Sequence, residues 1–140
     1  MNDEYFMNRA LDMAREAYKM DEVPVGCIIV KDNNVIASAY NRKEIDNIAT
    51  YHAEVVAINR ACRMLKTWRL DGCTMYTTVE PCMMCTGAIL QSRISRVVYG
   101  TSNESFGYLS KIDNYKLEIV SGILKDECSS LMSDFFKNKR

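Results

Sequence analysis

Hydrophobic residues recur at a helical spacing through the first twenty positions, which predicts an amphipathic helix there. The residues that share its apolar face are Phe6, Ala10, Met13, Ala14 and Ala17. Two β-rich runs follow at 23–30 (VPVGCIIV) and 35–40 (VIASAY), joined by the stretch KDNN. Paired asparagines tolerate the left-handed backbone that tight hairpins need, so a β-hairpin is predicted after the first helix.

The remainder of the chain alternates between helical and strand patterns. We predict helices at 52–65, from Pro81 to about Gln91, and at 125–139, with strands at 73–79 and 96–100 and a candidate fifth strand at 116–122. Proline suits the first turn of the middle helix. This order predicts an α/β fold with a mixed sheet and helices on its faces. Without repeats or linkers, residues 1–140 are predicted to form a single domain.

Composition and charge narrow the class of protein. The chain has 140 residues, of which 48% are hydrophobic and 26% charged, as is usual for a globular domain. Its 18 basic and 18 acidic residues cancel, so a nucleic-acid partner would have to meet a local patch. The sequence has neither the apolar core of a signal peptide nor an apolar run long enough to cross a bilayer. We therefore expect a cytoplasmic protein that has no membrane partner.

Six cysteines in a reducing compartment are expected to be thiols or metal ligands rather than disulfides. Four stand singly in apolar or helical segments and are interpreted as buried thiols: Cys27, Cys62, Cys73 and Cys128. Cys82 and Cys85, in the stretch PCMMC, are three residues apart and could hold one ion from a helix. The N-terminus of that helix would favour both sulfurs as thiolates.

His52 is the one imidazole of the chain, and with two thiolates it makes a three-ligand zinc site. The fourth position is then left to water, which zinc acidifies into a nucleophile. Residues two apart on a helix point about 200° apart, so His52 and Glu54 can serve the same ion only if it lies off the start of the helix. Glu54 could then move protons from the water to a substrate.

Each motif has an ordinary explanation when it is taken alone. A CxxC pair also fits a redox couple, and a single histidine fits a core or surface residue. H-x-E followed by P-C-x-x-C, in a helix-strand-helix context, is instead the signature of zinc deaminases that act on nucleobases. The two motifs together therefore predict a deaminase with one Zn²⁺ per chain.

Several stretches resemble, in order and nearly end to end, the bacterial tRNA adenosine deaminases that make inosine at the anticodon wobble position. They are EVPVG, Asn41, HAE, EPCMMCTGAI, SRISRVVYG and GILKDECSSLMSDFF. The resemblance implies a cytidine-deaminase-like three-layer α/β/α fold with a central mixed five-stranded sheet, usually as a homodimer. It also implies zinc held by His52, Cys82 and Cys85, with proton transfer by Glu54.

The same resemblance suggests a substrate pocket. Asn41 matches the family asparagine that hydrogen-bonds the base, although it also fits a turn residue that ends a strand. The positions that match pocket-lining residues are Val23, Pro24 and Val79.

The chain departs from the family pattern at three places around this pocket. Tyr51 stands beside the metal ligand, in IATY where the family commonly has DPTA, and Asn103 replaces an aspartate. The segment after Asn103 is several residues shorter, in a region that shapes the family's nucleic-acid surface. We count Tyr51 and Asn103 among the expected substrate contacts.

Two groups of basic residues are candidates for an RNA contact. Arg60, Arg63, Lys66 and Arg69 recur every three residues, and a solvated helix face explains them slightly better than RNA does. A second group at the C-terminus suits phosphate contact and base stacking, although basic C-termini are common. Its members are Lys137, Lys139, Arg140, Phe135 and Phe136.

The leading hypothesis is hydrolytic deamination of adenosine to inosine in a tRNA anticodon stem-loop. The alternative is the same chemistry on a free nucleobase, nucleoside or related heterocycle, such as a guanine, adenine or cytosine derivative. The shortened segment, Tyr51 and the zero net charge favour this alternative. A third hypothesis is a non-catalytic zinc-binding or dimerisation module, but such a module would not need Glu54.

Overall fold

The computed structural model describes residues 1–113 and 116–139. The chain begins with helix α1 (Asp3–Lys19) and a hairpin of strands β1 (Gly26–Lys31) and β2 (Asn34–Tyr40). The elements that follow are α2 (Lys43–Asp46), α3 (Ala53–Leu65), β3 (Thr74–Val79), α4 (Met83–Gln91), β4 (Arg96–Thr101), a 3-10 turn (Leu109–Lys111), β5 (Glu118–Ser121) and α5 (Lys125–Asn138).

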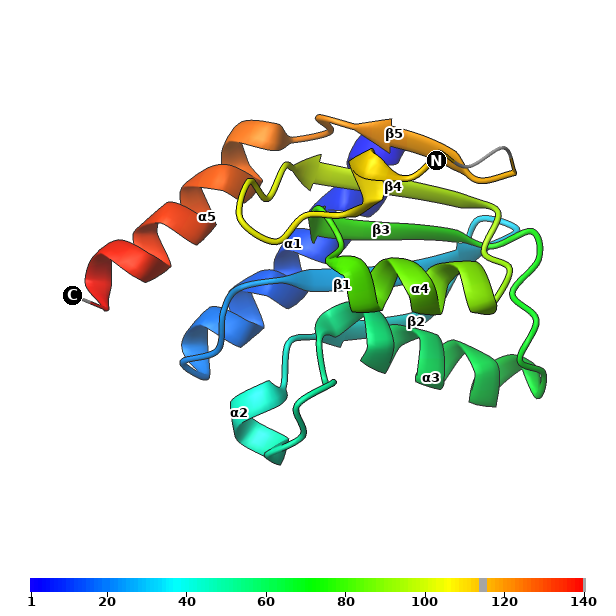
Figure 1. Ribbon diagram of the computed structural model, residues 1–140, viewed down its shortest axis with the longest axis horizontal. Helices are drawn as coiled ribbons and strands as arrows, with labels where there is room; N and C mark the ends of the chain where they lie inside the picture. The colour runs from blue at the N-terminus through cyan, green and yellow to red at the C-terminus, as the bar shows by residue number, and fades with distance from the viewer. Residues whose placement is uncertain (114–115, 140) are drawn as a thin grey trace.

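The five strands form one sheet in the order β2-β1-β3-β4-β5 (Figure 1). Strand β1 is antiparallel to both of its neighbours, whereas β3, β4 and β5 run parallel to one another. Helices α3 and α4 cover one face of the sheet, and α1 and α5 cover the other (Figure 1). The predicted mixed five-stranded sheet with flanking helices is therefore confirmed.

Each face of the sheet has its own hydrophobic core, because successive residues of a strand point to opposite faces. Ile29, Met75 and Val97 belong to the core beneath α3 and α4. Their neighbours Ile28, Tyr76 and Val98 belong to the core beneath α1 and α5. Burial on both faces explains why these strands are nearly continuous hydrophobic runs in the sequence.

Local details differ from the prediction at three places. The left-handed residues of the hairpin turn are Asp32 and Asn33, one position before the paired asparagines, because a type I′ turn needs positive φ at both central residues. Pro81 lies outside its predicted helix, since α4 begins at Met83 and Cys82 is its N-cap. The four residues of α2 were not predicted, since a single turn is too short to show periodicity.

The topology gathers the starts of two helices at one end of the sheet. Strand β3 ends at Val79, and three residues later Cys82 opens α4 at the carboxyl end of the parallel strands. Helix α3 opens at His52, whose ring lies beside Cys82. Among the described residues, none of the helices combines the length and apolar character needed to cross a bilayer.

Candidate active site

Three potential metal ligands meet where α3 and α4 begin. The Nδ1 atom of His52 lies 3.6 Å from Cys82 Sγ and 3.5 Å from Cys85 Sγ, and all three atoms lie within 4.8 Å of one another. In a tetrahedral site with Zn–N of about 2.0–2.1 Å and Zn–S of about 2.3 Å, a nitrogen and a sulfur ligand are about 3.5–3.6 Å apart. The donor set therefore fits a zinc ion.

Local structure explains how the two cysteines and the histidine converge. His52 is the N-cap of α3 and Cys82 the N-cap of α4, so both have extended backbone just ahead of a regular turn. The free N–H groups at the two helix starts favour negative charge between them. Hydrogen bonds with Cys85 and with the His52 ring lower the pKa of Cys82 to about 3, although burial opposes the shift.

Glu54 lies in the first turn of α3, only 4% exposed. Because His52 stands outside the regular helix, the imidazole and this carboxylate can face the same recess despite their spacing of two residues. Burial raises the pKa of Glu54 to about 7, although a hydrogen bond with its own backbone N–H opposes the shift. A carboxyl group with such a pKa can both take and give a proton near neutral pH.

Glu54 and two of the potential ligands, His52 and Cys82, line a recess of about 400 Å³, a size that suits one small molecule. Four of the expected substrate contacts line it: Val23, Asn41, Val79 and Asn103. Pro24 is buried, and Tyr51 packs against the core on the α3 side; neither is among the lining residues. The recess has further lining residues that no sequence motif indicates: Val25, Lys43, Ala53, Glu80, Phe106 and Met132.

Asn41 follows β2 directly, and its contacts are compatible with both roles considered for it, a turn residue and a contact to the base. Its Nδ2 donates to the Val23 carbonyl (3.3 Å) and its Oδ1 accepts from the Lys43 N–H (3.2 Å). These bonds make it a turn residue, and they also fix its amide in the wall of the recess. One Nδ2 hydrogen and one Oδ1 lone pair remain available to a bound base.

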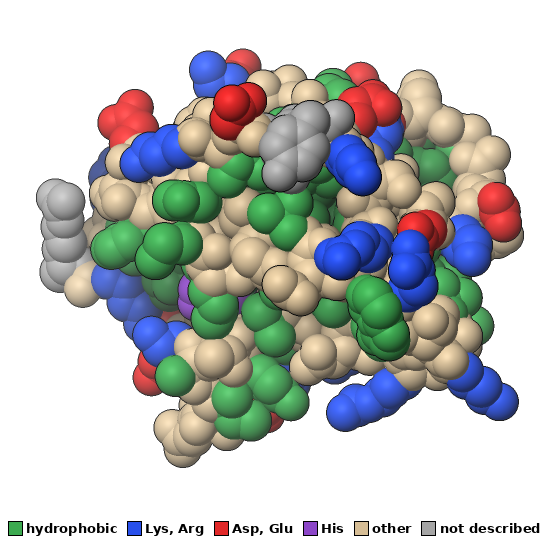
Figure 2. Space-filling model, turned by 45° about the vertical axis from the view of Figure 1, so that its right-hand side comes forward, with side chains coloured by type: hydrophobic (Ala, Val, Ile, Leu, Met, Phe, Trp, Pro, Cys, Tyr) green, Lys and Arg blue, Asp and Glu red, His purple; other side chains and the backbone are tan. Residues whose placement is uncertain are grey.

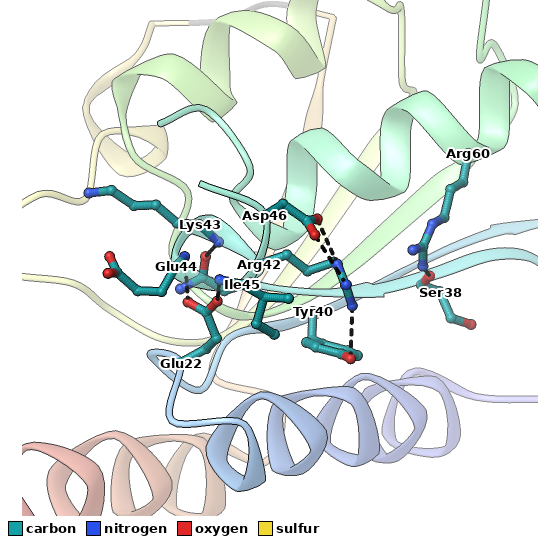
Figure 3. A network of polar contacts seen from close by, with 10 residues as sticks. Glu22, Ser38, Tyr40, Arg42, Lys43, Glu44, Ile45, Asp46 and Arg60 are labelled. Carbon is teal, nitrogen blue, oxygen red and sulfur yellow. Dashed lines mark hydrogen bonds and ion pairs between the residues drawn. The ribbon is translucent and has the colours of Figure 1, made fainter. Parts of the chain in front are cut away.

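A buried carboxylate that sequence reasoning missed holds the segment after Asn41. Glu22 is 1% exposed and accepts hydrogen bonds from the backbone N–H groups of Glu44 (3.2 Å) and Ile45 (2.6 Å), as Figure 3 shows. No local sequence pattern around a glutamate ahead of a strand indicates that its hydrogen-bond partners are amides 22 and 23 residues away.

The same segment is also fixed by Arg42. Its guanidinium donates to Asp46 at 2.8 and 3.3 Å and to the Tyr40 hydroxyl at 2.9 Å (Figure 3). A break in one of these bonds would leave the others in place, so this side of the recess is held redundantly.

Glu80 is a second buried carboxylate that the sequence motif did not explain. It is 4% exposed and accepts from the backbone N–H groups of Asn103 (3.3 Å) and Ser110 (2.8 Å). It therefore holds both ends of the loop that forms the opposite side of the recess.

The C-terminal candidates divide by exposure. Phe135 is 6% exposed and packs edge-on against Tyr18, while Lys139 pairs with Asp21. Phe136 and Lys137 are exposed and line a second recess on α5. Arg140 lies outside the described residues.

Two of the four residues in the other basic group form polar contacts within the protein. Arg60 donates to the Ser38 carbonyl at 2.6 Å (Figure 3), and Arg69 pairs with Asp71 at 3.0 Å. Lys66 ends α3 in a left-handed conformation. These contacts agree with a solvated face for this group.

Comparison with known proteins places the site in a family. A family model described as MafB19-like deaminase matches residues 1–140. A curated relative from Bacillus subtilis (strain 168), tRNA-specific adenosine deaminase, is 38% identical over 99% of this chain and 91% of its own length.

Two solved structures extend the likeness to three dimensions. One, from studies of A-to-I editing by tRNA:A34 deaminases at the wobble position, has a TM-score of 0.87 and 36% identity over 91% of this chain and 98% of that chain. The other, a guanine deaminase from Bacillus subtilis, has a TM-score of 0.72 and 38% identity over 82% of this chain and 79% of that chain. With its whole length matched by the family model and a fold shared with both enzymes, this chain belongs to the deaminase family that includes the tRNA-specific adenosine deaminases.

Proposed function

We propose that this chain, acting as one deaminase domain over residues 1–140, hydrolyses adenosine to inosine at the wobble position of a tRNA anticodon loop. The observation that carries the proposal is the buried carboxylate of Glu54, which faces a base-sized recess beside His52 and Cys82. The tRNA substrate is supported by the Bacillus subtilis relative and by the tRNA:A34 deaminase, 98% of which aligns with this chain. An enzyme with this substrate would work in the cytoplasm.

The resident cofactor we propose is one Zn²⁺ per chain, held by His52, Cys82 and Cys85. When bound there, zinc would supply an acidified water as the nucleophile. Cys82→Ala or Cys85→Ala should each reduce the zinc content measured by atomic absorption, while Cys62→Ala, outside the cluster, should retain it. Unchanged stoichiometry in both ligand variants would refute this ligand set.

The other recess residues have separate roles in the proposed reaction. Glu54 takes one proton from the attacking water and passes it to a ring nitrogen of adenine. It then takes the second proton, from the hydroxyl formed at C6, and gives it to the amino group, which leaves as ammonia while the C6 oxygen becomes a carbonyl. Asn41 hydrogen-bonds the base, and the apolar walls at Val23 and Val79 pack against its ring. Pro24, Tyr51 and Asn103 stay predicted substrate contacts.

The proton-transfer role has a direct test. Glu54→Ala and Glu54→Gln should lower inosine formation in an anticodon stem-loop by about 100-fold or more while zinc content is unchanged. Glu4→Ala, which removes an exposed carboxylate from α1, is the matched control. Full activity in both Glu54 variants would contradict the mechanism.

A free nucleobase such as guanine is a second candidate substrate. The 38% identity with a guanine deaminase favours it, and a recess of about 400 Å³ accommodates a single base. Ammonia release should be measured in parallel on the stem-loop and on free bases and nucleosides. Turnover of the stem-loop should fall steeply with ionic strength, whereas turnover of a neutral base should not, because only a polynucleotide releases counterions on binding.

We also propose a homodimer that uses the outer face of α3 and α4. Met64 and Trp68, at and just beyond the far end of α3, are 65% and 56% exposed, and Met83, at the start of α4, is 66% exposed. Several large apolar side chains exposed around one pair of helices favour burial against another chain. Sedimentation equilibrium should give twice the mass of the chain, and Trp68→Glu should reduce it to the monomer. A wild-type monomer would contradict the proposal.

A further inference from the structure

An exposed phenyl ring stands at the mouth of the recess, on the loop between β4 and the 3-10 turn. Phe106 lines the recess together with Glu54 and Cys82, yet 75% of it is accessible to solvent. A single exposed apolar side chain is ordinary on a protein surface. Its position here requires an explanation because the loop that carries it is held in place by many hydrogen bonds.

The loop fixes the backbone of Phe106 from both sides. The side-chain oxygen of Asn103 accepts from the N–H groups of Ser105 (3.2 Å) and Phe106 (3.1 Å). Gly107, the next residue, forms a β-bridge with Cys82, and Tyr108 N–H donates to the Pro81 carbonyl at 2.9 Å. The ring is thus attached one residue from a bridge to a metal ligand.

Glu80 and Gly107 add a second constraint beneath the loop. The carboxylate of Glu80 binds the loop at Asn103 and Ser110. A Cβ at position 107 would lie 2.4 Å from both the Asn103 carbonyl oxygen and Glu80 Oε1, so only glycine fits there. A buried carboxylate and a sterically required glycine hold a loop whose most exposed large hydrophobic side chain is Phe106.

The surroundings of the ring have the chemistry of a single-stranded nucleic-acid site. Met132 borders this recess and also the second recess on α5, which Phe136 and Lys137 line. Lys43 lines the recess that Phe106 borders, and neither Lys43 nor Lys137 has an ion pair among the described residues. Figure 2 shows hydrophobic side chains around the single histidine, with Lys and Arg side chains beside them.

We propose that Phe106 is a stacking platform for the base next to the target nucleotide of a single-stranded RNA loop, an inference that rests on the proposed tRNA function. Aromatic rings combined with cations along a path are the usual means of holding unpaired bases and their phosphates. Glu104, two residues before Phe106 and exposed, disfavours a phosphate at the ring itself, so the contact is with the face of a base. A free base would fill the recess without needing this platform.

The first test compares substitutions of Phe106 in the zinc-loaded protein. Phe106→Ala should lower kcat/KM on an anticodon stem-loop by about 5- to 150-fold, mainly through KM, since this is the range for one base stacked on an aromatic ring. Phe106→Tyr should retain activity, and Phe106→Leu, which keeps apolar area without a π face, should behave like the alanine variant. Tyr5→Ala, an exposed aromatic on α1, is the control.

A double-mutant cycle then asks whether the lost contact is with a neighbouring base. Stem-loops with an abasic site one nucleotide 5′ or 3′ of the target adenosine are assayed with both proteins. At one of the two positions, wild type should lose as much activity as Phe106→Ala loses on the intact loop, and the variant should lose nothing further. Additive losses at both positions, or an unimpaired Phe106→Ala, would overturn the stacking role.

The outcome for the wild-type protein separates this inference from the proposed function. If wild type turns over free bases but not the stem-loop, the tRNA function fails and the stacking role fails with it. If wild type deaminates the stem-loop while Phe106→Ala does so equally well, only the stacking role fails. The zinc content and melting temperature of each variant show whether a substitution disrupts the folded loop or removes only the stacking contact.

Discussion

Two segments flank the recess, residues 41–52 and 102–112. Each is held by a buried glutamate that accepts hydrogen bonds from two backbone N–H groups. Glu22 holds the first segment, where Arg42, Asp46 and Asn41 add further bonds (Figure 3). Glu80 holds the second, where the described side-chain bonds run through Glu80 itself and Asn103. The same device thus supports a wall whose side-chain bonds come from several residues on one side, and a loop whose side-chain bonds come from two residues on the other.

This difference predicts that the second segment is the more sensitive to a single substitution. A buried N–H group that loses a charged acceptor costs free energy unless water or another acceptor replaces it. Around Glu22, neighbouring bonds keep the chain in place after such a loss. Around Glu80, the loop that carries Phe106 would lose its side-chain acceptor at Asn103 and at Ser110 and would keep its backbone contacts to Pro81 and Cys82.

The largest effect is expected for Glu80→Ala. Two hydrogen bonds to a carboxylate are removed, so the free energy of unfolding should fall by about 3 kcal/mol, and deamination should fall with it. Urea unfolding of the zinc-loaded protein measures the first quantity. Glu104→Ala, in the same loop but exposed, should stay within about 0.5 kcal/mol of wild type. Equal stability of the two variants would remove Glu80 as the anchor.

Glu22→Ala should have a smaller effect, about 2 kcal/mol, because the ion pair of Arg42 and the bonds of Asn41 remain. Hydrogen exchange should accelerate at the amides of Glu44 and Ile45. If this variant is less stable than Glu80→Ala, the first segment, and not the second, is the more sensitive to the loss of its buried glutamate.

Asn103→Ala should cost about 1 kcal/mol, since two neutral hydrogen bonds of a turn are lost at a partly exposed site. The amide of Phe106 should then exchange faster. Asn103→Asp keeps the accepting oxygen and should retain slow exchange, so equal exchange rates in the two variants would exclude the side-chain oxygen as the cause.

The smallest effect is expected for Arg42→Ala and Asp46→Ala. Both side chains are partly exposed, 24% and 28%, and pairs of this kind contribute little to stability. Melting temperatures should change less than in either glutamate variant. A larger change than in Glu22→Ala would mean that the ion pair, and not the buried carboxylate, fixes the first segment.

Much of the fold could be predicted because it depends on local periodicity. The predicted β-hairpin and the central mixed sheet are present, and the candidate strand at 116–122 contains β5. Errors occurred where one or two residues decide the outcome. Turn geometry selected Asp32 and Asn33 in place of the asparagine pair, and Cys82 rather than a proline opens α4.

Part of the site was also accessible from the sequence. The H-x-E and P-C-x-x-C motifs contain His52, Cys82 and Cys85, whose ligand atoms lie within 4.8 Å of one another in the structure. These residues could be predicted because ligand chemistry restricts which side chains can share an ion. The spacing of His52 and Glu54 further required the ion to lie off the start of the helix, and His52 is indeed an N-cap.

The alternation of elements, the two covered faces of the sheet and the residue types of the reactive cluster thus follow from the sequence alone. Each of these depends on intervals of a few residues or on an inventory of side chains. The partners of Glu22 and Glu80 depend on the folded chain, because their acceptor oxygens meet amides 22 to 30 residues away. The exposure of Phe106 at the recess was decided in the same way, since it depends on how a distant loop folds back onto Cys82.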